Sequence, residues 1–147
     1  GAYVMAGGIE GDTMIGGRGA DTLSGDSGDD VLTGGKGGDM LTGDDGADTF
    51  VFASAADSTK KAHDQITDFV AGTDHIDLSG IDARSDKAGD QAFRLVDHFT
   101  HEAGQLTLTH DAGGEVTHVK ADVDGDGKAD LWIDVNGQLT DTTGFVL

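Results

Sequence analysis

A nine-residue period over residues 7–51 constrains the fold of this chain more than any other feature of the sequence. Five units follow one another without a gap and share the pattern G-G-x-G-x-D-x-U-x, in which U is a large apolar residue. The sixth place is Asp in every unit. The eighth place is always apolar, and its occupants are Met14, Leu23, Leu32, Leu41 and Phe50. A flexible Gly/Asp linker would not hold two residue types in one phase, so the segment is structured.

The spacing predicts a coil of short stacked strands. A six-residue turn rich in Gly permits positive φ, and the three remaining residues form a short strand. Two turns and two strands close one coil, so each unit stacks on the unit two places further along the chain. Met14, Leu32 and Phe50 then line the inner face of one sheet, and Leu23 and Leu41 line the other. We predict an all-β fold that begins with a right-handed parallel β-roll.

The negative charge of the chain predicts that a cation is bound. Asp and Glu number 28 against 9 Lys and Arg, which gives a net charge of −19. Stacked Asp residues would repel one another, and five inward side chains cannot offset the ordering of about 45 Gly-rich residues. A hard cation that takes six to eight oxygen ligands resolves both problems, so we expect Ca²⁺ between the turns. The same charge excludes nucleic acid as an unaided partner, and no apolar run is long enough for membrane insertion.

These repeats resemble the calcium-binding β-roll of the RTX (repeats-in-toxin) family, and the resemblance implies a ligand pattern for three to five Ca²⁺ ions. One turn contributes the carbonyls of places two and four and its Asp, and the turn two units on contributes the carbonyls of places one and three and its Asp. The first implied set is Gly8, Glu10, Asp12, Gly25, Ser27 and Asp30. The second is Gly17, Gly19, Asp21, Gly34, Lys36 and Asp39, and the third is Asp26, Gly28, Asp30, Gly43, Asp45 and Asp48.

A fourth set extends this pattern beyond the repeats. Asp57 lies 18 residues after Asp39, in phase with the Asp column, and Asp64 follows seven residues later. The set is Gly35, Gly37, Asp39, Asp57 and Asp64. At the other end, Glu10 stands where the pattern expects Gly, so we expect the first site to be strained or half-formed.

Residues 52–147 carry a second resemblance. The run D-x-I-x-D-F-x-x-G-x-D-x-I-D-L-S, from Asp64 to Ser79, is similar to the C-terminal domain of serralysin-type secreted metalloproteases. Alternating apolar residues in 105–110, 116–123 and 129–135 predict an antiparallel β meander that packs against the roll and caps it. We also expect a short helix near 82–89, and one structural unit made of the repeats 7–51 and the cap 52–147.

The remaining motifs give weaker evidence for a metal site or a catalytic site. Asp122, Asp124 and Asp126 begin like an EF-hand loop, but Ile133 stands where the bidentate Glu belongs. A solvated turn is the favoured interpretation of this segment, and a metal site is the alternative. The sequence has no H-E-x-x-H, G-x-S-x-G or P-loop motif and no Cys. We therefore expect no catalytic residue in this chain.

Together these features predict a calcium-binding C-terminal module of a larger secreted bacterial protein, with a hydrolase such as a metalloprotease as the parent. No N-terminal signal peptide is visible, and the chain does not begin with Met. The resemblance implies type I secretion, in which an ABC exporter reads the extreme C-terminus, here residues 141–147. One alternative is a polysaccharide-binding module of a secreted enzyme such as an alginate epimerase. The other is a self-associating module of a surface layer or biofilm.

Overall fold

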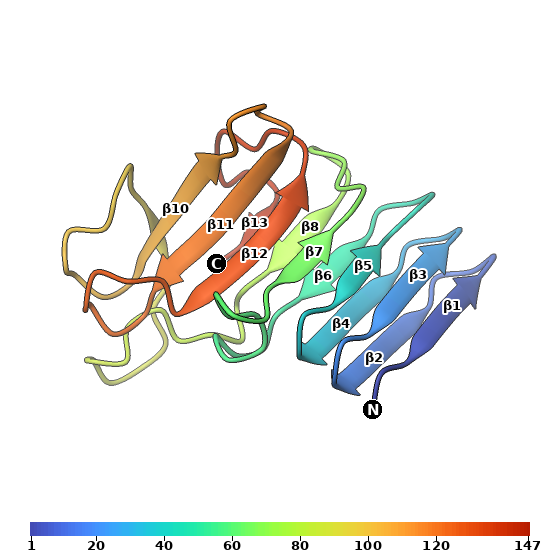
Figure 1. The fold of residues 1–147 in the computed structure, drawn as a ribbon, viewed down its shortest axis with the longest axis horizontal. Coiled ribbons are helices and arrows are strands. Elements are labelled where there is room, and N and C mark those ends of the chain that lie inside the picture. Colours follow the sequence, from blue (N-terminus) through green and yellow to red (C-terminus); the bar gives the residue numbers. More distant parts are fainter.

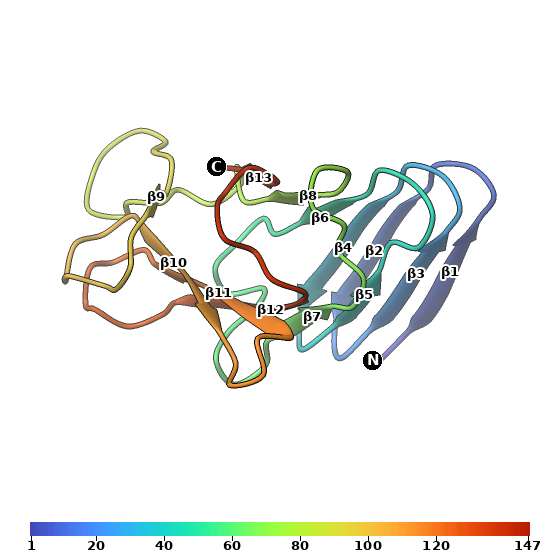
Figure 2. The ribbon, with the colours of Figure 1, turned by 90° about the horizontal axis from the view of Figure 1, so that it is seen from above.

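A computed structural model describes all residues, 1–147, and consists of strands and turns without a helix (Figure 1). The strands form two sheets that face each other across a narrow core (Figure 2). The larger sheet contains, in spatial order, β1 (Val4–Gly8), β3 (Thr22–Asp26), β5 (Met40–Thr42), β7 (Asp64–Ile66), β12 (Leu131–Asn136), β11 (Val116–Asp122), β10 (Gln105–His110) and β9 (Arg94–Leu95). The smaller sheet contains β13 (Phe145–Val146), β8 (His75–Asp77), β6 (Thr49–Val51), β4 (Val31–Lys36) and β2 (Thr13–Arg18). None of these elements is a helix of the length and apolar character needed to cross a bilayer.

The repeats stack as their spacing predicts, each unit on the unit two places further along the chain. Strand β2 pairs in parallel with β4, with Thr13 opposite Val31, and β3 pairs in parallel with β5, with Thr22 opposite Met40. Both registers are offsets of 18 residues, or two nonapeptides. The predicted parallel β-roll is therefore confirmed.

The parallel stack is longer than the five repeats at both ends. Strand β1 pairs with β3 in the same 18-residue register, with Met5 opposite Leu23. Beyond the repeats, β7 pairs with β5 and β8 pairs with β6, again in parallel. The roll thus includes strands on either side of residues 7–51.

The predicted antiparallel meander that caps the roll is also confirmed, and it covers the open end of one sheet. Strands β10, β11 and β12 form the antiparallel pairs, and β12 then pairs in parallel with β7, with Ile133 opposite Asp64. The meander therefore continues one sheet of the roll edge to edge and does not pack on its face. Strand β13 pairs with β8 and covers the corresponding edge of the second sheet. Both edges of the roll at this end are closed, which protects them from unwanted pairing.

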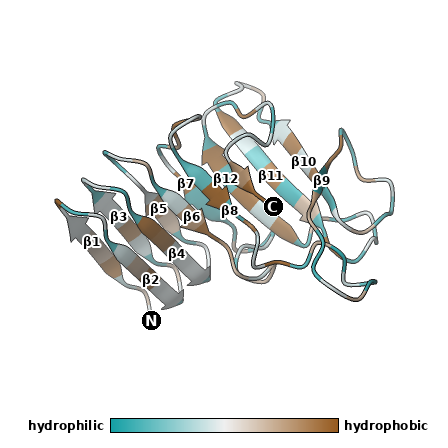
Figure 3. Ribbon diagram, turned by 180° about the vertical axis from the view of Figure 1, so that it is seen from behind, coloured by the Kyte–Doolittle hydropathy of each residue, from teal (hydrophilic) through white to brown (hydrophobic).

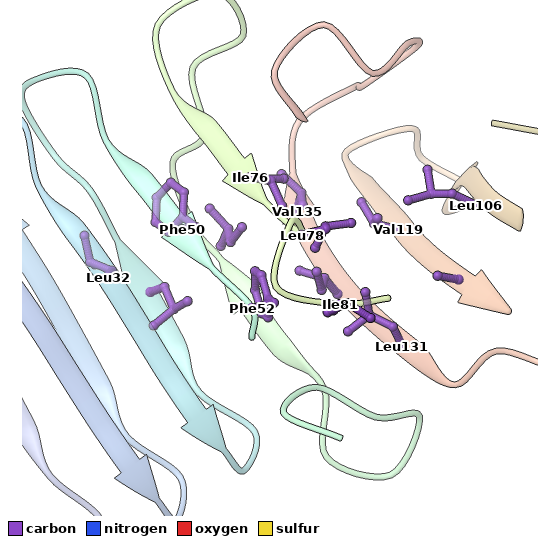
Figure 4. Packing of buried hydrophobic residues seen from close by; sticks show 14 of the residues in the cluster. Leu32, Phe50, Phe52, Ile76, Leu78, Ile81, Leu106, Val119, Leu131 and Val135 are labelled. Carbon is purple, nitrogen blue, oxygen red and sulfur yellow. The ribbon is translucent and has the colours of Figure 1, made fainter. Parts of the chain in front are cut away.

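One continuous core runs through the roll and the meander. Its cluster of 19 buried side chains includes all five apolar residues of the repeats, which alternate between the two sheets as predicted. Figure 4 shows Leu32 and Phe50 followed by Ile76, Leu78, Val135 and Val119 across the junction. Figure 3 shows the same apolar segments on the strands. The meander thus supplies the burial that the repeats alone lack.

The short helix expected near 82–89 is wrong, because this segment forms turns and bends. The Asp82 carboxylate accepts hydrogen bonds from the amides of Arg84 and Gln91, at 3.1 and 3.4 Å. Asp86 forms an ion pair with Arg84. Side-chain bonds of this kind hold the backbone in turns and compete with helix formation.

Candidate metal centre

The Asp residues at the sixth place of each repeat form two ladders through the roll. The Asp12 amide donates to Asp30 Oδ1 at 2.7 Å, and the same 18-residue step recurs along both ladders. Beyond the repeats, the Asp39 amide donates to Asp64 Oδ1 at 2.9 Å. The first ladder is Asp12, Asp30, Asp48 and Asp74, and the second is Asp21, Asp39 and Asp64. Each step uses one carboxylate oxygen, and the other oxygen is free at every acceptor except Asp74, whose Oδ2 accepts the Val70 amide at 2.8 Å.

The second carboxylate oxygen of most ladder residues is buried without any partner. The atoms are the Oδ2 atoms of Asp21, Asp30, Asp39, Asp48 and Asp64. These side chains belong to residues that are at most 2 % exposed. Buried carboxylates without a counter-charge are strongly unfavourable, and nearly all buried polar atoms in proteins have a partner. The donor set therefore fits a hard cation that binds oxygen.

Main-chain oxygens converge on the same positions. A Cβ atom added at Gly16 would lie 2.6 Å from both Asp21 Oδ2 and the Gly34 carbonyl oxygen. The corresponding point at Gly7 lies 2.6 Å from Asp12 Oδ2 and 2.5 Å from the Gly25 carbonyl oxygen. The first-place Gly thus leaves room where an Asp from one turn approaches a carbonyl from the turn two units on. This pairing belongs to the first and second predicted ligand sets.

The turns share one backbone conformation, with the exception of the first. Places two and four have positive φ in the second to fifth units, and Gly17 and Gly19 are examples at 104° and 124°. Asp26 replaces Gly at place two and still has a φ of 71°, a region that Asp tolerates better than most residues. Gly8 and Glu10 do not have positive φ. The first predicted site, which contains both residues, is therefore built differently from the others.

The fourth predicted set is also brought together. The Asp57 carbonyl accepts a hydrogen bond from the Gly37 amide at 3.4 Å, just as the Asp45 carbonyl accepts from Gly28 one unit earlier at 2.8 Å. Asp57 therefore occupies the third place of a further turn through its main chain, so its expected position in the Asp column is wrong, and Asp64 takes that position. Asp64 meets Asp39 through the second ladder. Asp57 is nearly buried, and its Oδ2 accepts a hydrogen bond from the Ser54 amide.

The electrostatics of the ladders favour a bound positive charge. Burial raises the pKa of Asp64 to about 8, and the nearby charges of Asp39 and Asp57 add to this shift against the effect of the Asp39 amide. Burial is also the main cause of the raised pKa values of Asp39 and Asp48. A carboxylate with a raised pKa binds either a proton or a cation. At neutral pH a divalent cation is the stronger neutraliser of several adjacent carboxylates.

The acidic turn near residue 125 assembles differently from the EF-hand expectation. Carboxylate oxygens of Asp122, Asp124 and Asp130 lie within 4.8 Å of one another, whereas Asp126 pairs with Lys128 at 2.9 Å. Asp126 is therefore not a member of the group, and Asp130 was not foreseen. Both Asp122 oxygens accept turn amides at 2.7 and 2.8 Å. These bonds hold the turn between β11 and β12.

The family model of the peptidase M10 serralysin C terminal matches residues 2–147. The chain belongs to the serralysin C-terminal family. It is 40% identical over 93 residues to metalloprotease AprA of Pseudomonas entomophila (strain L48), a match that covers 63% of this chain and 19% of that protein. It is 35% identical over 98 residues to serralysin C of Dickeya chrysanthemi, covering 67% of this chain and 19% of that protein. The chain thus spans about a fifth of the length of these curated relatives.

Two solved structures share the fold of this serralysin C-terminal chain. The AlgE6R3 subunit of the Azotobacter vinelandii mannuronan C5-epimerase matches with a TM-score of 0.71 and 27% identity, covering 99% of this chain and 77% of that chain. The AlgE6R2 subunit of the same enzyme matches with a TM-score of 0.67 and 25% identity, covering 99% and 92%. Both comparisons support the parallel β-roll of stacked repeats.

The sequence analysis missed two acidic residues of this serralysin C-terminal site. Asp74 continues the first ladder, because the Asp48 amide donates to its Oδ1 at 3.1 Å. Asp68 accepts the amides of Gly43 and Asp44, at 3.0 and 2.7 Å. A signal for Asp74 was present, since Asp64 follows Asp39 by 25 residues and Asp74 follows Asp48 by 26. The last step of each ladder is therefore longer than the 18-residue step within the repeats by a similar number of residues.

Proposed function

We propose that this serralysin C-terminal module binds three to five Ca²⁺ ions between its turns and folds when it meets calcium outside the cell. The observation that supports the proposal best is the set of five buried Oδ2 atoms without a partner. The ligands are those of the four predicted sets, with Asp74 as an addition. Ca²⁺ supplies a hard positive charge that accepts carboxylate and carbonyl oxygens with flexible geometry. The protein supplies the stacked turns that hold those oxygens together.

The energetics make calcium a switch for folding. At −19 the metal-free chain repels itself, and its ligands meet only when the roll is formed. With a Kd near 10⁻⁴ M and millimolar external calcium, each site contributes roughly 1–2 kcal/mol. Four such sites contribute about 4–8 kcal/mol, which is comparable to the stability of a whole domain. At the low calcium concentration of the cytosol this contribution is lost.

The same switch suits type I secretion, in which an ABC exporter moves an extended chain. Without calcium the module stays unfolded until it emerges, and it needs no disulfide to fold because it has no Cys. We assign the export signal to residues 141–147. Strand β13 lies within this segment, and the amide of Ile76 donates to the Gly144 carbonyl at 2.8 Å. The segment therefore serves the fold as well as the proposed signal.

An export assay separates these two roles. Residues 52–147 fused to an inert passenger are expected to leave cells that carry a matching type I apparatus, and deletion of Gly144–Leu147 is expected to abolish export. Because the chain is unfolded during export, the loss of strand β13 can weaken the fold only after export. A loss of export itself therefore reports on the signal. If the deletion variant were secreted as well as the undeleted fusion, the assignment of the signal would be contradicted.

We further propose that the module is not the catalytic part of the full-length protein, and that the parent is a secreted metalloprotease. The names of the relatives and the family match support this proposal.

Calcium stoichiometry tests the central part of the proposal. Native mass spectrometry and isothermal titration calorimetry are expected to show three to five Ca²⁺ per chain, with much weaker binding of Mg²⁺, because Mg²⁺ demands a stricter octahedral geometry. One ion or none per chain at millimolar calcium would contradict it.

A further inference from the structure

The only Asn of the chain, Asn136, is followed directly by Gly137. Asn136 is the last residue of β12, and Gly137 leaves the strand with a φ of 112°. Asn is among the chemically labile residues of proteins, because the main-chain nitrogen of the next residue can attack its side-chain amide carbon. A following Gly makes this attack easiest, since it has no Cβ to hinder the approach. The structure decides when this pair of residues can react.

Both ends of the Asn136 side chain are bound in the folded chain. Its Oδ1 accepts a hydrogen bond from Gln65 Nε2 at 3.1 Å, and its Nδ2 donates to the Thr67 carbonyl at 3.0 Å. Gln65 lies in β7 and Thr67 follows that strand, so the Asn136 amide continues the join between β7 and β12 beyond their last main-chain pair. A rotation of the side chain toward Gly137 breaks these two bonds.

The attacking nitrogen is held as firmly as the amide. The Gly137 N–H donates to the Glu115 carbonyl at 2.7 Å, and the Gly137 carbonyl accepts from Thr117 Oγ1 at 2.7 Å. Thr117 is fully buried, and its Oγ1 accepts in turn from the Leu139 amide at 3.0 Å. The nitrogen must lose its proton before it attacks, and an amide proton in such a hydrogen bond is released only when the segment opens. The folded chain therefore blocks both partners of the reaction.

We propose that Asn136–Gly137 is a site of spontaneous deamidation that reacts only in the unfolded chain, and that it acts as a chemical timer on the unfolded module. The Gly137 nitrogen loses its proton and attacks Asn136 Cγ, and ammonia leaves with a proton taken from water, which yields a succinimide ring. Water then opens the ring. Cleavage between the nitrogen and Cγ gives Asp, and cleavage between the nitrogen and the main-chain carbonyl carbon gives isoaspartate. The net reaction consumes one water and releases one ammonia.

Either product weakens the junction between the roll and the meander. An Asp carboxylate at position 136 has no N–H to donate to the Thr67 carbonyl, so two acceptors face each other. Isoaspartate adds a methylene to the main chain and displaces the Gly137 N–H from Glu115. The loss is irreversible, because the released ammonia does not return. Only the step in which calcium protects Asn136, by keeping the chain folded, rests on the proposed function.

Ammonia release and the mass of the tryptic peptide 129–147 follow the reaction. Isomerisation of the three Asp–Gly pairs, at Asp45, Asp124 and Asp126, changes neither quantity. The whole chain is incubated at one pH and temperature in excess calcium, in EDTA, and in EDTA with guanidinium chloride. We expect deamidation at least about tenfold faster in guanidinium chloride than in calcium, because only the open chain reacts.

The same three samples show what would overturn the inference. No mass gain in guanidinium chloride would overturn the reactive pair, and equal rates in guanidinium chloride and in calcium would overturn the protection by the fold. A slow rate in EDTA beside a fast rate in guanidinium chloride would support the deamidation site and contradict calcium-coupled folding. The two failures are therefore distinguishable.

Matched variants assign the reaction and its consequence. In guanidinium chloride, where folding plays no part, Asn136→Gln is expected to slow ammonia release at least about tenfold, because the longer side chain closes a less favourable ring. Asn136→Asp makes one product directly, and Gln138→Glu makes the same amide-to-acid change at an exposed side chain two residues on. We expect Asn136→Asp to lower the urea midpoint in calcium and Gln138→Glu to leave it nearly unchanged. Equal midpoints of these two variants would contradict the role of Asn136 in the junction.

Discussion

At the scale of single residues, the ladder positions are not equivalent. Asp39 accepts the Asp21 amide, donates its own amide to Asp64 and belongs to two predicted ligand sets. Asp12 belongs to one set, in the turn that lacks positive φ at Glu10. We expect Asp39→Asn to lower calcium affinity at least about tenfold and to reduce cooperativity, whereas Asp12→Asn has a smaller effect. Calcium titrations followed by calorimetry measure both, and equal losses would contradict the ligand assignment.

The first-place glycines provide a second test at residue scale. Gly16→Ala places a Cβ 2.6 Å from both Asp21 Oδ2 and the Gly34 carbonyl oxygen, where the two ligands of one predicted site converge. We expect a clear loss of calcium affinity, because the methyl group occupies the space between them. Gly8→Ala is the matched control, since its Cβ would lie 3.8 Å from the nearest atom, Asp12 Oδ2, and its φ is not positive. Similar affinities of the two variants would show that the space at Gly16 is not a cation position.

At the scale of elements, one buried hydroxyl joins the roll to the meander. Ser58 Oγ donates to the Trp132 carbonyl and accepts from the Asp64 amide at 2.7 Å, so it ties β7 to β12. Ser58→Ala leaves both main-chain groups without this partner, which we expect to cost about 2–4 kcal/mol of unfolding free energy. Ser79→Ala removes an exposed hydroxyl that bonds Asp77 and should cost less than about 1 kcal/mol. Urea unfolding in calcium compares the two, and equal midpoints would contradict the role of Ser58.

The elements also show how much of the fold the sequence predicts. Strict phase predicts the stacking of units and the inward side of Leu23 and Phe50, because an apolar residue at every ninth place has only one way to be buried. The added strand β1 was missed, because Tyr3 stands where the repeat requires Asp, although its amide still donates to Asp21. The edge-to-edge join of β12 and β7 depends on contacts between residues about 70 positions apart. Local patterns carry no information about such pairings.

The candidate site was predictable to the same degree. The ligand sets within the repeats are what the resemblance to the RTX family implies for the nine-residue phase, and Asp64 was added because it lies seven residues after Asp57. Asp74 lies beyond an insertion, so its place in the ladder depends on how β8 stacks on β6. Asp130 stands where Asp126 was expected, because the Asp126 carboxylate pairs with Lys128 and does not join Asp122 and Asp124. Competition between side chains in space decides these positions.

At the scale of the whole molecule, the buried ladders predict a pH dependence that calcium reverses. The folded-state pKa of Asp64 is raised to about 8, so the metal-free fold gains stability from the bound proton at acidic pH and loses it as the pH rises through about 8. With calcium present the sign changes, because protons displace the cation as the pH falls. We expect the metal-free protein to be about 1–3 kcal/mol more stable at pH 5 than at pH 8.

The folded fraction in EDTA, followed by circular dichroism from pH 5 to pH 8, and the urea midpoints in calcium at the same two pH values measure this reversal. Asp64→Asn is the control, since it removes the proton-binding group and should reduce the pH dependence in EDTA. An unchanged dependence in this variant would show that other groups, such as the six His, cause it.

Folding coupled to calcium is the central claim, and circular dichroism with and without calcium tests it most directly. In EDTA at neutral pH the chain is expected to give a coil spectrum, because the buried carboxylates and the charge of −19 oppose the roll. Addition of millimolar Ca²⁺ is expected to produce a cooperative transition to a β spectrum, reversed by excess EDTA. A fully folded β spectrum in EDTA, with a melting temperature that calcium does not raise, would contradict the account.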